Sequence, residues 1–113
     1  MFVGVARIVV QIPGARSLKD RRAVVRSFKD RAAARLKISV AEIGDPERWQ
    51  IATFGIAVVS SDRSRCEALV TSAVSIARSL SNALVADVRT EILSFGHGGE
   101  NIKHGIESAL DDE

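Results

Sequence analysis

The sequence predicts an α+β domain in which a four-stranded antiparallel sheet carries two helices on one face. The main observation is the apolar pattern, whose period changes in the order strand, helix, strand, strand, helix, strand. In addition, a length of 113 residues suits a single domain, and 46% hydrophobic residues are enough to form its core. Two βαβ units joined in this order form the ferredoxin-like split βαβ arrangement, βαββαβ.

A turn at Pro13-Gly14 separates the first two expected elements. Residues 2–12 are rich in β-branched side chains and predict a strand whose even-numbered positions face the core. Ser17 is a typical N-cap, and the pattern from Leu18 to Lys37 predicts a helix. Its buried face would be an apolar stripe with helical spacing: Leu18, Val25, Phe28, Ala32 and Leu36.

The second half of the chain repeats this plan. Ile38 to Ile43 predicts a short strand, and Trp49 to Ser60 predicts a long one after a loop. Ser61-Asp62 would cap a second helix, whose apolar stripe runs from Cys66 to Leu80. Leu84 to Phe95 predicts a half-exposed edge strand, and its core-facing positions would be Leu84, Ala86, Val88 and Ile92.

The sequence changes character after the last expected strand, so we assign the ferredoxin-like domain to residues 1–95. Residues 96–113 begin with glycines and continue with apolar residues at four-residue steps, among five acids and one lysine. This composition predicts a flexible C-terminal tail, in which the apolar steps either form a short helix or fray.

Residues that carry metal or nucleophilic chemistry are scattered. His97 and His104 are both in the tail, and Cys66 lies on a core stripe, so we expect no metal site and no catalytic pair. A single cysteine cannot form an internal disulfide, which is consistent with a reducing cytoplasm. No apolar run is long enough to span a bilayer. We therefore expect a cytoplasmic protein that is not an enzyme and uses no cofactor, metal or membrane.

Positive charge is concentrated between Pro13 and Lys37. This stretch has nine basic residues and two acids, a net charge of +7, whereas the whole chain carries +2. Such density is typical of a surface that contacts nucleic-acid phosphates. The alternative is a solvated helix face whose arginine stems cover apolar surface. The predicted nucleic-acid-binding residues are Arg16, Lys19, Arg21, Arg22, Arg26 and Lys29.

The sheet face opposite the helices is expected to be open and apolar. For this face the two long strands offer only Phe2 and Trp49 as aromatic residues, each at a strand end, which disfavours an RNA-recognition sheet that stacks bases. An apolar face without aromatic residues more often contacts a protein, commonly a second copy of the same chain. The predicted protein-interface residues are Val3, Val5, Val9, Ile51, Ala57 and Val59.

Two blocks, IPGARSLKDRRAVVRSFKDR and ISVAEIGDPERWQIATFGIAVVSSD, resemble the YlxP-like family of bacterial proteins of unknown function. The resemblance spans about Val3 to Leu93, and the tail after Phe95 lies outside it. It implies a small ferredoxin-like cytoplasmic protein whose gene lies beside those of translation initiation factor two and ribosome-binding factor A. This gene neighbourhood suggests, by association alone, a role with RNA or the ribosome. The resemblance implies no catalytic residues.

Three functional hypotheses follow. The first is a non-catalytic RNA- or ribosome-associated module that binds through the basic helix. The second is a protein-interaction module, or a homodimer, that uses the open sheet face. The third and weakest is a small-molecule or enzyme site in the loop Glu42–Trp49, where Glu42 and Asp45 would supply two carboxylates.

Overall fold

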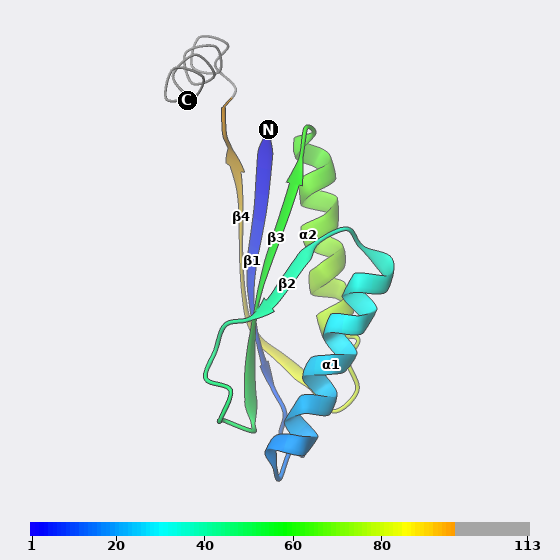
Figure 1. Ribbon diagram of the computed structural model, residues 1–113, viewed down its shortest axis with the longest axis vertical. Coiled ribbons are helices and arrows are strands. Elements are labelled where there is room, and N and C mark those ends of the chain that lie inside the picture. Colours follow the sequence, from blue (N-terminus) through cyan, green and yellow to red (C-terminus); the bar gives the residue numbers. More distant parts are fainter. Residues whose placement is uncertain (97–113) are drawn as a thin grey trace, which may run out of the picture.

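The structure, a computed structural model, describes residues 1–96 (Figure 1). The four strands form one antiparallel sheet in the order β2-β3-β1-β4, and Figure 1 shows both helices on the same side of it. This confirms the ferredoxin-like βαββαβ fold and the edge position of the last strand. The predicted tail helix and both histidines lie outside the described residues. The elements are β1 (Phe2–Gln11), α1 (Leu18–Arg35), β2 (Ser39–Glu42), β3 (Ile51–Ser60), α2 (Arg63–Arg78) and β4 (Leu84–Ser94).

Both helices begin at the predicted caps. The Ser17 hydroxyl accepts a hydrogen bond from the Asp20 N–H at 3.2 Å, and the Asp20 carboxylate accepts one from the Arg16 N–H at 2.9 Å. At α2, Asp62 is the N-cap and accepts bonds from the Ser64 hydroxyl and N–H. The Ser64 hydroxyl, followed by the backbone N–H groups, lowers the pKa of the Asp62 carboxyl from 3.8. The cap therefore contributes to stability at neutral pH, and its contribution is lost as the pH falls through this lowered pKa.

The core lies between the helices and the inner face of the sheet. Phe28 of α1 contacts Phe54 of β3, with ring centroids 4.4 Å apart, and neither side chain is exposed. Gly4 of β1 lets α2 approach closely, since a Cβ at this position would lie 2.9 Å from Cγ2 of Val70. Cys66 is fully buried, as its place on the apolar stripe predicted.

The alternation predicted for β4 is wrong at its beginning. Leu84 is 60% exposed and Ala86 is also exposed, whereas Val85 packs against the core. The pairing of β4 with β1 shifts between Val9 and Val10, and Ala86 is the extra residue at this bulge. A bulge adds one residue to one strand and so reverses which positions face inward. The positions beyond it follow the prediction, because Val88 and Ile92 pack against the core.

We predict that Phe28→Ala lowers the free energy of unfolding by about 3–5 kcal/mol, because it leaves a cavity opposite Phe54. Urea denaturation followed by circular dichroism measures this loss. Leu84→Ala is the matched control, since that side chain is 60% exposed and its removal should cost less than about 1 kcal/mol. Equal losses for the two variants would contradict the observed core.

Candidate nucleic-acid interface

Arg21 lies on the buried face of α1 and is only 2% exposed. It precedes Val25 by four residues and Phe28 by seven, so helical geometry places it in line with the core residues. Leu18, which the sequence pattern assigned to the buried stripe, is instead 40% exposed. The protein encloses the Arg21 guanidinium, so Arg21 is removed from the set of candidate phosphate contacts.

The guanidinium of Arg21 binds three carbonyl oxygens and one carboxylate. Its Nε donates to the carbonyls of Arg48 at 2.9 Å and Ile51 at 3.1 Å. Its Nη2 donates to the carbonyl of Asp45 at 3.3 Å and forms an ion pair with Glu42. These partners lie at the end of β2, in the β2–β3 loop and at the start of β3. One arginine fork therefore fixes the first turn of α1 to that loop.

These contacts also bear on the third hypothesis, a site built from two loop carboxylates. The Glu42 carboxylate is paired with Arg21, and the Asp45 carboxylate accepts a hydrogen bond from the Glu47 N–H at 2.9 Å. Both groups are engaged in holding the loop, and this is a sufficient explanation for their presence.

Two further contacts hold the β2–β3 loop against the sheet. The Ile12 N–H donates to the Gln50 carbonyl at 2.8 Å. Gly44 closes over Thr53, since a Cβ on Gly44 would lie 2.9 Å from the Thr53 hydroxyl oxygen. Thr53 is only 9% exposed, although it points to the helix-free face of the sheet. The loop is thus fixed from both sides of the sheet.

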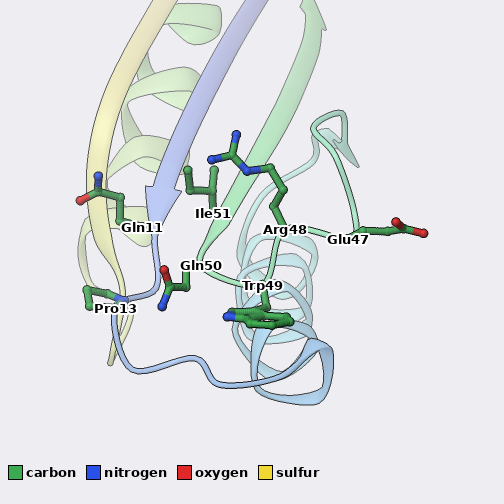
Figure 2. A pocket seen from close by; sticks show the side chains of 7 residues that line it. All are labelled: Gln11, Pro13, Glu47, Arg48, Trp49, Gln50 and Ile51. Atoms are coloured by element: carbon green, nitrogen blue, oxygen red, sulfur yellow. The ribbon is translucent and has the colours of Figure 1, made fainter.

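The end of this loop forms one wall of a cavity of about 540 Å³, which we call the Trp49 pocket. Trp49 was expected to begin the long strand, but β3 begins at Ile51, so Trp49 belongs to the loop. Figure 2 shows the Gln50 amide between Pro13 and Trp49, the side chains of Gln11 and Arg48 directed away from the Trp49 ring, and Glu47 pointing away. The residues that line the pocket are Gln11, Pro13, Glu47, Arg48, Trp49, Gln50 and Ile51.

The third hypothesis placed a small-molecule or enzyme site in the loop Glu42–Trp49, and Glu47, Arg48 and Trp49 of that loop line this pocket. The two carboxylates named for that site, Glu42 and Asp45, do not line it. Trp49 is 46% exposed, so anchoring the loop does not account for all of its surface.

The other predicted nucleic-acid-binding residues remain at the surface of the protein. Lys19, Arg22, Arg26 and Lys29 follow one another at steps of three, four and three residues, so they form one row along α1. We call these four residues the basic row, and it is about 15 Å long. Lys29 is half-buried and the other three are exposed, as is Arg16 just before the helix.

The basic row is not neutralised within residues 1–96. The ion pairs in this part of the chain involve Arg7, Arg21 and Arg63, and none involves the row or Arg16. Arg31, on the opposite flank of α1, donates to the Ser79 hydroxyl of α2 at 2.8 Å. The row therefore lies on the flank of α1 that faces away from α2.

The predicted interface residues do share the helix-free face of the sheet. Strand pairing places Val3 opposite Val59, and the other residues of the set follow at alternate positions along β1 and β3. Directly opposite residues of paired strands point to the same face. Val59 is 63% exposed. The shared face is a property of the fold, and it does not identify a partner.

Two kinds of residue limit this apolar face. Ile43 packs over Gly55, where a Cβ would lie 3.1 Å from its Cγ2 atom, so the centre of β3 is partly covered. Along β4 the face becomes charged, and the Arg7 guanidinium pairs with the Asp87 carboxylate at 3.5 Å. The exposed charges of this margin are Arg7, Asp87, Arg89 and Glu91.

Within residues 1–96, no cluster of three or more His, Cys, Asp or Glu side chains is placed to hold a metal ion. None of the helices in this part of the chain is both long and apolar enough to cross a membrane.

A family model described as "Protein of unknown function (DUF503)" matches residues 3–90. The chain belongs to the DUF503 family. This DUF503 chain is 39% identical over 66 residues to the uncharacterized protein YlxP of Bacillus subtilis (strain 168). The alignment covers 58% of this chain and 72% of that protein, and it confirms the resemblance to the YlxP-like family.

A solved structure shows the same fold as the DUF503 chain. The de novo designed protein Foldit4 has a TM-score of 0.52 at 12% identity, and the match covers 85% of this chain and all of that chain. A second designed protein, described as having a ferredoxin fold, has a TM-score of 0.46 at 10% identity and covers 88% of both chains. Likeness at this level of identity concerns the fold alone.

We predict that Arg21→Met lowers the free energy of unfolding by about 3–5 kcal/mol, because Glu42 and three carbonyl oxygens lose their partner. Urea denaturation measures the loss. The emission of Trp49, the only tryptophan, reports whether the loop moves. Arg22→Met is the matched control, and it should change stability by no more than about 0.5 kcal/mol because Arg22 is exposed. If both variants were equally stable, Arg21 would not be holding the loop.

Proposed function

We propose that this DUF503 protein is a non-catalytic RNA-binding module that contacts phosphates through Arg16 and the basic row. The observation that carries the proposal is the row itself: four cations on one flank of α1, with no ion-pair partner within residues 1–96. Both acids of the helix, Asp20 and Asp30, are exposed, and neither forms an ion pair with the row; the Asp20 carboxylate accepts a hydrogen bond from the Arg16 N–H. An RNA backbone supplies the counter-charge that residues 1–96 do not.

The geometry of α1 suits such a contact. Phe28 and Arg21 fix the buried side of α1 to the rest of the protein. The helix therefore presents its cations to an RNA without a change in its own position. A rigid surface loses little conformational entropy on binding. Cations that neutralise phosphates release condensed counterions, which makes the affinity fall steeply with salt. Contacts of this kind position an RNA and read little of its sequence.

The proposed target is structured RNA of the ribosome in the cytoplasm. This choice rests on the gene neighbourhood that the YlxP-like resemblance implies, and on the charge of the basic row. The helix-free face of the sheet within residues 1–96 is not aromatic, which suits a binder of RNA shape and backbone.

We predict that Arg22→Glu/Arg26→Glu weakens RNA binding at least tenfold without unfolding the protein, because both side chains are exposed. Binding to a fluorescein-labelled ribosomal RNA fragment is measured by anisotropy at several salt concentrations. The slope of log affinity against log salt should become shallower by roughly 1.5 units, at about 0.7–0.9 for each phosphate that the variant no longer neutralises.

The control is Arg65→Glu/Arg78→Glu on α2, which changes the net charge equally at two exposed positions away from the row. If both double variants weaken binding to the same extent, the attraction is general and the row is not the site. If wild-type protein does not bind RNA at low salt, the proposed function is wrong.

A second candidate function is self-association through the helix-free face of the sheet. Val59, Val3 and Leu93 lie opposite one another across β3, β1 and β4, and Val59 and Leu93 are 63% and 43% exposed. The charged margin along β4 carries two cations and two acids, so a second copy related by a two-fold axis can pair opposite charges. These features favour a second copy of this chain as the partner.

We predict a concentration-dependent mass for the wild-type protein in sedimentation equilibrium, and its loss in Val59→Asp. The exposed position of Val59 lets the monomer accept the charge. Ala68→Asp, at an exposed position on α2, adds the same charge away from this face and should leave the association unchanged. A wild-type protein that stays monomeric at all concentrations would exclude this candidate.

A further inference from the structure

The Trp49 pocket combines the groups that a nucleobase needs. Trp49 is 46% exposed and offers an aromatic ring for stacking. The Gln50 amide, which lies between Pro13 and Trp49 in Figure 2, has two donors and an acceptor and so matches the mixed edges of a base. Pro13 supplies apolar surface beside it, whereas Gln11, Arg48 and Ile51 line the cavity farther from the Trp49 ring. Stacking on an aromatic side chain together with hydrogen bonds at the base edge is how proteins hold unpaired bases.

The charge and size of the pocket fit the same ligand. Glu47 is the only acid among the described residues that line it, and Figure 2 shows its carboxylate pointing away from the other lining side chains. The described lining therefore places no carboxylate beside Trp49 and Gln50, which suits a negatively charged nucleotide chain. A volume of about 540 Å³ lies within the usual range of small-ligand pockets.

The pocket is also held in a fixed arrangement. Arg21 binds the carbonyls of Arg48 and Ile51 on either side of Trp49, and Ile12 binds the carbonyl of Gln50. The loop therefore presents Trp49 without first having to become ordered, which lowers the cost of binding. A base that covers the exposed part of Trp49 removes apolar surface from water, which favours stacking on this ring.

The position of the pocket connects it to the basic row. Arg21 joins the first turn of α1 to the loop that carries Trp49, so the row begins at the same end of the molecule as the pocket (Figure 1). We propose that the Trp49 pocket binds one unpaired nucleobase of an RNA whose backbone lies along the basic row. This inference rests on the proposed function and makes it more specific, because the RNA must then be single-stranded at this end.

The test uses two RNA probes, both of them polyanions: a fluorescein-labelled oligouridylate, which is single-stranded, and a blunt-ended RNA duplex. Since the chain has one tryptophan and no tyrosine, its emission reports on Trp49 alone. We expect the oligouridylate to quench this emission and the duplex to leave it unchanged. Trp49→Ala should weaken oligouridylate binding by about 5- to 150-fold, which is the loss of affinity expected when one base no longer stacks on an aromatic ring.

Two controls separate stacking from a structural role of Trp49. Trp49→Phe keeps an aromatic ring and should restore most of the affinity, while Trp49→Ala should leave duplex binding and its salt slope unchanged. Gln50→Ala removes the amide beside Trp49 but keeps the backbone carbonyl that accepts from the Ile12 N–H, and it should weaken oligouridylate binding by a smaller factor. Circular dichroism checks that each variant is folded.

The outcomes distinguish failure of the pocket from failure of the proposed function. If oligouridylate binds wild-type and Trp49→Ala equally and does not quench, the pocket proposal is wrong and the basic row acts alone. If neither RNA binds at low salt, the proposed function fails and uridine monophosphate becomes the probe. Quenching by the nucleotide would then support the pocket as a nucleobase site, and unchanged emission would overturn it.

Discussion

One buried guanidinium holds together the parts of this protein that matter for its proposed function. Arg21 joins α1 to the end of β2, the β2–β3 loop and the start of β3 through three carbonyls and the Glu42 carboxylate. A loop packed against a helix must satisfy its carbonyl groups, and Arg21 does so here. Burying a charge is costly, so the net stability gained is smaller than the number of bonds suggests. The clearest consequence of the Arg21 contacts is that the basic row and the Trp49 pocket keep one fixed position relative to each other.

The candidate surfaces occupy different sides of a thin molecule. The basic row lies on the flank of α1 away from α2, whereas the apolar face of the sheet is on the side without helices. The Trp49 pocket shares Gln11 and Ile51 with one end of that face, while the exposed Val59 and Leu93 lie near Val3 at the other end. Val3 and Gln11 are about 26 Å apart along an extended strand. Self-association at the Val59 end is therefore compatible with RNA binding at the Trp49 end.

The errors of the sequence-based prediction have physical causes. Ala86 reverses the alternation of β4 because a bulge adds a residue that no apolar pattern records. Leu18 was predicted to be buried and Arg21 to be exposed, and the structure shows the reverse. Hydrophobic periodicity counts apolar side chains only, so it cannot show that a buried cation will find hydrogen-bond and ion-pair partners. Arg21 finds its partners 21 to 30 residues away along the chain. The loop Glu42–Trp49 was a candidate small-molecule site, but the lining of its pocket escaped prediction for the same reason, because Gln11 and Pro13 approach it only in the folded protein.

The amino-acid sequence by itself determined the order of strands and helices, the two caps at Ser17 and Asp62, the antiparallel sheet and the family. It also placed an excess of positive charge on the first helix. The elements, the caps and the charge depend on residues close together in the chain, where local spacing and local hydrogen bonds decide the outcome, and the sheet arrangement follows from the order of the elements. Only the tertiary structure decided which arginine of that helix turns inward, where the β2–β3 loop lies and that a pocket forms beside Trp49. Those features depend on contacts between distant segments, whose partners no local pattern identifies.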